Sequence, residues 1–318
     1  MTESTEIPLL DLGELDLDDP KSCTILVDDF RWIFEHIGFA YVIGHGVDSG
    51  LIDSVFDASR RFHSLPLERK MAVELNRIHR GFIAANSTTD INSKLAEVTK
   101  PNQSESFMMM REDEAEDPEV YLSGPNQWPD LVGFREVLED YHQIMSRLGF
   151  RLMKIALKAS GAEDLGFMSA FEYPPTWLRL LMYPAYPEEA EDDLYGSAPH
   201  TDFGCLTLLA QDQTGGLQVK STSGVWLEVP HIKSSFVLNV GDMLHRLSNG
   251  RLLSTPHRVI NLSGRKRFSC AFFYDANVNT MICPLIGTGQ PRFEPVRFGD
   301  FLKAELKAGY DRYKYGMD

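Results

Sequence analysis

The chain contains few cysteines, and none of them form a close pair. Only four occur among 318 residues, at Cys23, Cys205, Cys270 and Cys283, without a C-x-x-C motif. This spacing gives no support to a zinc ribbon or to a thioredoxin-type redox site. We therefore expect free thiols in a reducing compartment.

Basic residues are also scarce. Lys and Arg number 31 against 46 Asp and Glu, which gives a formal net charge of −15. Nucleic-acid binding requires a basic face, so we expect no nucleic-acid partner. No apolar run reaches the roughly 18 residues that a membrane span needs, and the first residues are acidic where a signal peptide is basic. These absences predict a cytoplasmic protein with no membrane partner.

The motifs of several large enzyme classes are missing. The sequence has no G-x-x-x-x-G-K-[ST], no G-x-G-x-x-G and no G-x-S-x-G, so nucleotide-binding loops and nucleophile elbows have no support. It also lacks a 20–50-residue repeat, which argues against a solenoid or a propeller. With 43% hydrophobic residues, the chain can bury a sizeable core.

Helix and strand patterns alternate in the first half of the sequence. The predicted strands are at 7–12 and 38–44. One predicted helix begins at Asp19-Pro20, and three others are at 49–64, 67–75 and 130–160. Residues 80–121 show neither a helical nor a strand period, and they include a run of three methionines at 108–110. We expect an irregular segment there that covers a pocket.

The second half has the pattern of an all-β core. Short strands separated by glycine-containing turns are predicted at 177–183, 201–211, 217–220, 236–240, 258–262 and 268–274. Many short strands with such turns favour a jelly roll or a barrel. A last helix is expected at 298–313, so the predicted class is α+β and rich in strands.

One histidine and one carboxylate stand two residues apart at the start of an apolar strand. In a strand, His200 and Asp202 would share a face, while Cys205 would point away from it. A second imidazole could come from His257 or from His245, and spacing alone does not decide between them. Two histidines and one carboxylate on one face are typical of non-haem Fe(II) oxygenases, which keep open coordination positions.

A second pair, Arg267 and Ser269, also shares a strand face. A guanidinium inside a barrel needs a partner, which could be a protein carboxylate such as Asp242 or a bound dicarboxylate. Tyr183 lies on the same face as Leu181 in its own strand, and its spacing alone fits a core aromatic residue.

Seven blocks of sequence resemble the isopenicillin N synthase-like members of the non-haem Fe(II)/2-oxoglutarate-dependent dioxygenase superfamily. The likeness runs nearly end to end and includes Gly38-Phe-Ala-Tyr-Val-Ile-Gly44, His200-Thr-Asp-Phe-Gly204, Asn239-Val-Gly-Asp242, Ser254-Thr-Pro-His-Arg-Val259 and Arg267-Phe-Ser269. The resemblance implies a double-stranded β-helix (jelly roll) core flanked by helices.

The same resemblance implies roles for individual residues. His200, Asp202 and His257 would bind Fe(2+), and the Ser-x-x-His-Arg-Val match is the reason to prefer His257 to His245. Arg267 and Ser269 would hold the distal carboxylate of the co-substrate 2-oxoglutarate, with support from Tyr183. O2 would be the oxidant and ascorbate an auxiliary reductant. Two departures are noted: Leu181 stands where many relatives have Asn, and His245 where Gln or an apolar residue is commoner. Phe107, Met110 and Phe273 are expected to shape the substrate pocket. Independently of the resemblance, Arg80 and Glu105-Ser106-Phe107 in the irregular segment are candidates for the pocket rim.

The implied activity is hydroxylation or desaturation of a small molecule with release of succinate and CO2. Two alternatives stay open at this point, an iron oxidase of the isopenicillin N synthase type that does not use 2-oxoglutarate, and a non-catalytic metal or small-acid binder. We expect one compact unit with an N-terminal region at 5–120, a supporting helix at 121–170, the β-helix core at 171–284 and a helical extension at 285–318.

Overall fold

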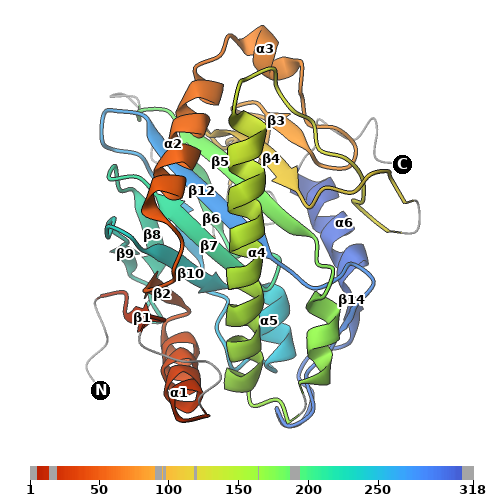
Figure 1. Cartoon of the computed structure of the whole chain (residues 1–318). Coiled ribbons are helices and arrows are strands. Elements are labelled where there is room, and N and C mark those ends of the chain that lie inside the picture. The colour runs from red at the N-terminus through yellow and green to blue at the C-terminus, as the bar shows by residue number, and fades with distance from the viewer. Residues whose placement is uncertain are drawn as a thin grey trace.

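A computed structural model describes residues 6–13, 20–89, 95, 98–117, 120–163, 165–186 and 194–309. In it two β-sheets face each other, and helices cover the outer face of the larger one (Figure 1). This is the expected strand-rich α+β arrangement with a double-stranded β-helix core flanked by helices.

The larger sheet joins the two halves of the chain. Its strand order is β1-β2-β10-β7-β12-β5-β4-β3. The strands are β1 (Leu9–Asp11), β2 (Phe39–Ile43), β3 (Gly81–Ile83), β4 (Glu105–Met110), β5 (Thr176–Tyr183), β7 (Leu206–Gln211), β10 (Phe236–Val240) and β12 (Arg267–Tyr274). Because β2 pairs with β10 and β4 with β5, the N-terminal strands extend the sheet on both sides of the later ones.

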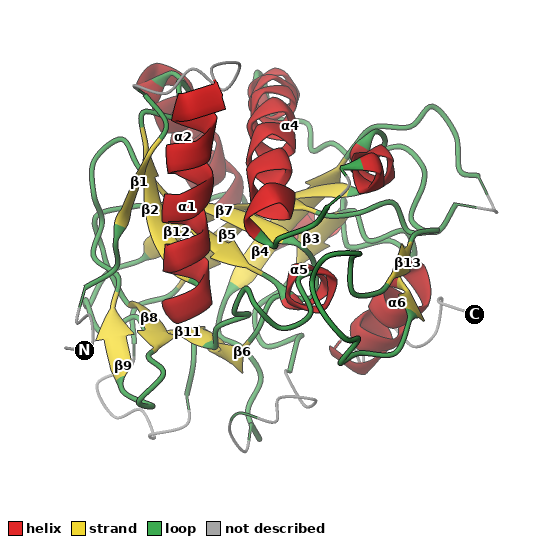
Figure 2. Cartoon of the chain, turned by 90° about the horizontal axis from the view of Figure 1, so that it is seen from below, coloured by secondary structure: helices red, strands yellow, loops and turns green. Residues whose placement is uncertain are grey.

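The smaller sheet lies across the inner face of the larger one. Its order is β6-β11-β8-β9, with β6 (Ser197–His200), β11 (His257–Val259), β8 (Leu217–Lys220) and β9 (Trp226–Glu228). Figure 2 shows these strands on one side of the larger sheet and α4 on the other. A two-stranded ribbon, β13 (Met281–Ile282) with β14 (Val296–Arg297), lies beside the last helix.

Helix α4 (Phe134–Ala159) is the centre of the outer layer and packs against α1 (Pro20–His36), α2 (Ser49–His63) and β12. Its buried positions, among them Leu138, Tyr141, Met145, Leu148 and Leu152, recur every three to four residues and form one apolar face. Gly149 lets the helix approach the sheet, since a Cβ there would lie 2.5 Å from the Tyr274 ring.

The remaining helices are short or terminal. They are α3 (Leu67–Met71), the 3₁₀ helix η1 (Gly166–Phe171), α5 (Asp242–Leu247) and α6 (Phe298–Gly309). The helix predicted at 67–75 ends earlier, at Met71. The predicted start of the first helix at Asp19 and the predicted end of the last helix beyond residue 309 lie outside the described residues. None of the described helices is long and apolar enough to cross a membrane.

Two predictions of secondary structure were wrong. The segment at 80–121 contains β3 and β4, and all six residues of β4 are buried. A strand covered on both faces shows no alternation, which explains the missing period. The strand predicted at 201–211 is split, because the chain leaves the smaller sheet at His200 and enters the larger sheet at Leu206. Neither β9 nor α5 was predicted.

Candidate active site

Two histidines meet where β6 and β11 pair in the smaller sheet. His200 ends β6, His257 begins β11, and the two residues are direct cross-strand partners. Their ring centroids are 4.3 Å apart. Asp202 joins them from the loop between β6 and β7 rather than from the same strand as His200. Proximity of the first two side chains therefore comes from strand pairing, and that of the third from the turn after β6.

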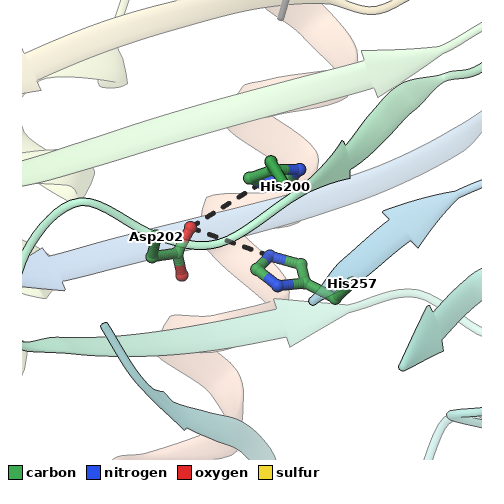
Figure 3. A group of neighbouring side chains, drawn as sticks. All are labelled: His200, Asp202 and His257. Atoms are coloured by element: carbon green, nitrogen blue, oxygen red, sulfur yellow. Dashed lines mark ion pairs between the residues drawn. The ribbon is translucent and has the colours of Figure 1, made fainter. Parts of the chain in front are cut away.

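The three side chains converge on one point. Asp202 Oδ1 lies 3.7 Å from Nε2 of His200 and 3.7 Å from Nε2 of His257 (Figure 3). One ligand atom from each residue lies within 4.8 Å of the other two. Two imidazole nitrogens and one carboxylate oxygen at this spacing match a facial metal triad.

Hydrogen bonds to the backbone orient both imidazoles. Nδ1 of His200 lies 2.7 Å from the Ala198 carbonyl oxygen, and Nδ1 of His257 lies 3.3 Å from that of Thr255. A carbonyl accepts, so each Nδ1 carries the proton and donates it to this bond. Each Nε2 then presents its lone pair toward Asp202, which is the tautomer that a metal ligand needs.

The Asp202 carboxylate is held as an anion. Its Oδ2 accepts hydrogen bonds from Thr207 Oγ1 at 2.5 Å and from Asn239 Nδ2 at 2.7 Å, which leaves Oδ1 directed at the imidazoles. Burial by itself raises the pKa of Asp202, but the neighbouring His257 and His200 and the two hydrogen bonds outweigh it and lower the pKa. The anionic form of a carboxylate is the one that binds a metal.

A second buried carboxylate fixes the loop that carries Asp202. Asp275 Oδ1 accepts the backbone N–H of Cys205 at 2.8 Å. It can come this close because residue 204 is glycine, where a Cβ would lie 1.6 Å from the same oxygen. Burial raises the pKa of Asp275 to about 7. The donor set, its tautomers and this rigid loop fit a divalent transition metal such as Fe(2+).

Arg267 forms a second centre on the inner face of the larger sheet. Its guanidinium is fully buried and donates to the Gly215 carbonyl at 2.8 Å, to Ser269 Oγ at 3.2 Å and to Gln211 Oε1 at 3.3 Å. It forms no ion pair with a carboxylate of the described residues. A buried cation whose partners are all neutral fits a bound anion, and a guanidinium suits a carboxylate.

Tyr183 completes the surroundings of Arg267. The two residues are cross-strand partners of β5 and β12, and the guanidinium carbon lies 4.7 Å from the centroid of the Tyr183 ring. Leu181 faces the same side, is 7% exposed and belongs to the apolar cluster between the sheets. The polar contact that Asn would provide is therefore replaced by an apolar wall.

The alternative partners considered from the sequence lie elsewhere. Asp242 accepts from Ser254 Oγ at 2.6 Å and from Thr201 Oγ1 at 3.2 Å, so it is not the counterion of Arg267. His245 lies in α5, where its Nδ1 is 2.6 Å from the Leu252 carbonyl oxygen, and it is not part of the metal-competent group.

Three expected pocket residues serve the scaffold instead. Phe107 packs on the outer face, 5.0 Å from Phe62 and 5.1 Å from Phe134 between ring centroids. Arg80 is buried and donates to three backbone carbonyls. Glu105 accepts from Lys70 Nζ at 2.7 Å and lies 2.8 Å from His63 Nδ1; this Glu105 cluster lies behind the sheet. Phe273, by contrast, shares the inner face with Ser269 and Arg267.

Sequence reasoning missed the residues that support the site, namely Thr207, Gln211, Asn239 and Asp275. A signal existed for two of them, since Thr207 and Gln211 alternate with apolar residues in β7 and so face the interior. Asn239 and Asp275 gave no such signal, because their partners come from distant segments.

Comparison with known proteins agrees with this geometry. Residues 171–276 match the family model of the 2OG-Fe(II) oxygenase superfamily, and residues 7–131 match that of the non-haem dioxygenase in morphine synthesis N-terminal region. The first match contains the triad and the Arg267 centre.

Full-length relatives cover nearly the whole chain. The 2-oxoglutarate-Fe(II) type oxidoreductase hxnY of Emericella nidulans is 35% identical, over 97% of this chain and 91% of the relative. A homoarginine-6-hydroxylase of Arabidopsis thaliana is 33% identical over 89% of each chain. A full-length Neurospora crassa protein, solved in complex with alpha-KG and thymine, superimposes with a TM-score of 0.82 at 28% identity, covering 95% of this chain and 96% of that one. The chain thus belongs to the 2-oxoglutarate-Fe(II) oxygenase superfamily and is a 2-oxoglutarate/Fe(II)-dependent dioxygenase.

Proposed function

We propose that His200, Asp202 and His257 hold Fe(2+), that Arg267 and Ser269 bind 2-oxoglutarate with Tyr183 beside them, and that the enzyme hydroxylates a small organic molecule. The observation that carries this proposal is the pairing of two centres on the inner faces of the sheets. One is a triad in which the Nε2 atoms of both histidines lie 3.7 Å from Asp202 Oδ1, and the other is a fully buried guanidinium without a carboxylate partner among the described residues.

Bound Fe(2+) supplies the activation of O2 that couples decarboxylation of 2-oxoglutarate, to succinate and CO2, with insertion of one oxygen atom into a substrate C–H bond. The chain's own contribution is orientation. Arg267 fixes one end of 2-oxoglutarate by a charge-assisted bidentate contact. Asp202 stays anionic, and the imidazole tautomers stay set, through their hydrogen bonds.

Exclusion of water is the other contribution of the chain. Leu181, Val219, Val237, Val259 and Ala271 belong to the apolar cluster between the two sheets. This lining keeps the local dielectric low, so the contact between Arg267 and a carboxylate is stronger than it would be in water. Arg267 therefore combines binding strength with a fixed geometry.

A small molecule is the substrate class that the relatives support. One is named a homoarginine hydroxylase, and another was solved with thymine. The oxidase alternative, which does not use 2-oxoglutarate, is less well supported because the relatives are named for 2-oxoglutarate. The non-catalytic alternative is disfavoured by the intact triad.

The proposed organisation follows the predicted ranges as one unit, with an N-terminal region at 5–120, a supporting helix at 121–170, the core at 171–284 and an extension at 285–318. Support comes from the sheet itself, where β2 pairs with β10 and β4 with β5. The N-terminal region thus completes the sheet that carries Arg267.

The test is succinate formation by purified protein given Fe(2+), ascorbate, O2 and 2-oxoglutarate. We expect slow turnover without a primary substrate, lost in His200→Ala together with bound iron. The exposed His36, replaced in the same way, is the matched control and should retain both. Iron bound in 1:1 ratio with no succinate under any concentration of 2-oxoglutarate would instead support the oxidase alternative.

A further inference from the structure

A second arginine lies on the inner face of the larger sheet and takes no part in the proposed iron and 2-oxoglutarate centres. Arg179 is in β5, two residues before Leu181 and four before Tyr183, so by strand alternation it shares their face. Its register partners are Ala271 in β12 and Met108 in β4. It is half-buried, in contrast to the fully buried Arg267.

The guanidinium of Arg179 is mostly unused by the protein. Its Nε donates to Ser106 Oγ at 2.9 Å, and it forms no ion pair with an acidic residue of the described chain. An arginine carries five N–H donors, so the outer fork of this side chain is available to a ligand. The lack of a partner is notable because the chain carries 46 acidic residues.

Around Arg179 the inner wall is apolar and contains no carboxylate from the described strands. The inward positions of β5 and β12 next to it are Trp177, Leu181, Ala271 and Phe273. Phe273 is the diagonal neighbour of Arg179 across the two strands, close enough for an aromatic side chain to reach it. A ligand that binds the guanidinium would therefore pack its body against aromatic and aliphatic groups.

Sheet register places Arg179 at a useful distance from the metal centre. Ala271 pairs with Leu209 of β7, and Thr207, two residues along β7, donates to Asp202. Arg179 is thus two strands from the wall beside the triad, or about 10 Å at the usual spacing of neighbouring strands. A small molecule can span this distance with one end on Arg179 and a C–H bond near the metal.

We propose that Arg179 is the specificity-determining residue for the primary substrate, and that this substrate is a small organic acid whose carboxylate binds the Arg179 guanidinium. Its apolar body packs on Phe273 and presents a C–H bond to the metal centre. The two guanidinium groups then bind different ligands. Arg267 binds the co-substrate, and Arg179 binds the acid to be hydroxylated. This inference rests on the proposed function.

The test measures binding without turnover. Protein loaded anaerobically with Fe(2+) and saturating 2-oxoglutarate is titrated with matched acid and amide pairs, namely phenylacetate and phenylacetamide, cinnamate and cinnamamide, hexanoate and hexanamide. Quenching of tryptophan fluorescence is the readout, and Trp177, on the same face as Arg179, is its nearest reporter. In the wild-type protein, at least one acid should bind about 10- to 100-fold more tightly than its amide.

Variants separate a charge contact from a structural role. Arg179→Gln should lose that preference by weakening the acid about 10- to 100-fold while its amide binds as before, and Arg179→Lys should restore part of it. Arg135→Gln, on the exposed face of α4, is the control and should keep the wild-type preference. The proposal is overturned if no acid binds, if amides bind as well as acids, or if Arg179→Gln keeps the preference.

The same preparations distinguish failure of this inference from failure of the proposed function. Acid-selective binding that depends on Arg179, without succinate formation dependent on His200, would refute the proposed function alone. Succinate formation that depends on His200, together with equal binding of acids and amides, would refute the role of Arg179 alone.

Discussion

Replacing Arg267 with Met tests whether the buried guanidinium is held for an anionic ligand. The side chain is fully buried with three neutral acceptors and no described carboxylate. Breaking a buried ion pair typically costs about 3–5 kcal/mol, because one charge is left alone. Arg267→Met would leave no charge without a partner. The three acceptors would lose their donor, which destabilises the fold, but the cost of burying a cation would also disappear. The free energy of unfolding without ligand should therefore fall by no more than about 2 kcal/mol.

The effect on 2-oxoglutarate should be much larger. Losing a bidentate charged contact weakens binding by roughly 100-fold, at about 3 kcal/mol. At a 2-oxoglutarate concentration of about 100 times the wild-type Kd, ligand stabilisation is about 2.7 kcal/mol in the wild type and about 0.4 kcal/mol in the variant. For a chain of 318 residues, the unfolding entropy per residue converts these values into melting shifts of about 4 °C and under about 1 °C.

Thermal denaturation of metal-loaded, anaerobic protein with and without 2-oxoglutarate is the assay. Arg80→Met is the matched control, since Arg80 is equally buried and also donates to three neutral acceptors. It should lower the melting temperature but keep the full shift with 2-oxoglutarate. A full shift in Arg267→Met would refute the assignment of this residue to the co-substrate.

Three further changes test the supporting structure. Glu105→Gln removes the carboxylate from Lys70 and leaves a buried charge, so the free energy of unfolding should fall by about 3–5 kcal/mol; a denaturant titration showing less than about 1 kcal/mol would contradict this. Asp275 has its pKa raised from 3.8 to about 7, so the folded state keeps a proton that the unfolded state has already released. Stability of the metal-free protein should therefore fall between about pH 4 and 7, by up to about 4 kcal/mol, and Asp275→Asn should flatten that decline, as denaturation at several pH values would show. Gly204→Ala places a Cβ against Asp275 and should displace the Asp202 loop, with at least about 10-fold less iron retained on dialysis; wild-type iron content would argue against the clash.

Strand alternation predicted the side chains of single strands well. Arg267, Ser269 and Phe273 share a face in β12, as their spacing required. Strand alternation does not predict which distant strands pair. Spacing left His257 and His245 both possible as the second imidazole, and only the register between β11 and β6 places His257 beside His200. The two-residue spacing of His200 and Asp202 predicted neighbours correctly but for the wrong reason, because a turn rather than a continuous strand brings Asp202 to the site.

The less predictable parts have a common physical origin. β4 is buried on both faces, and its run of Met108, Met109 and Met110 has neither a strand nor a helix period. Asn239 and Asp275 act on Asp202 and Cys205 across 37 and 70 residues of sequence. Such contacts depend on how the two sheets stack, which local patterns do not encode.

The pairing of β2 with β10 also determines how the protein can be made. Phe39 and Asn239 are register partners about 200 residues apart, and contacts of such separation slow folding because a long loop must close first. During synthesis, β2 and the parallel strand β1 emerge long before β10 exists to receive them. Residues 39–43, nearly all buried in the finished sheet, must therefore stay exposed or covered by chaperones until most of the chain has left the ribosome. Fragments that end before residue 236 would keep this apolar edge open, and we expect them to aggregate rather than fold.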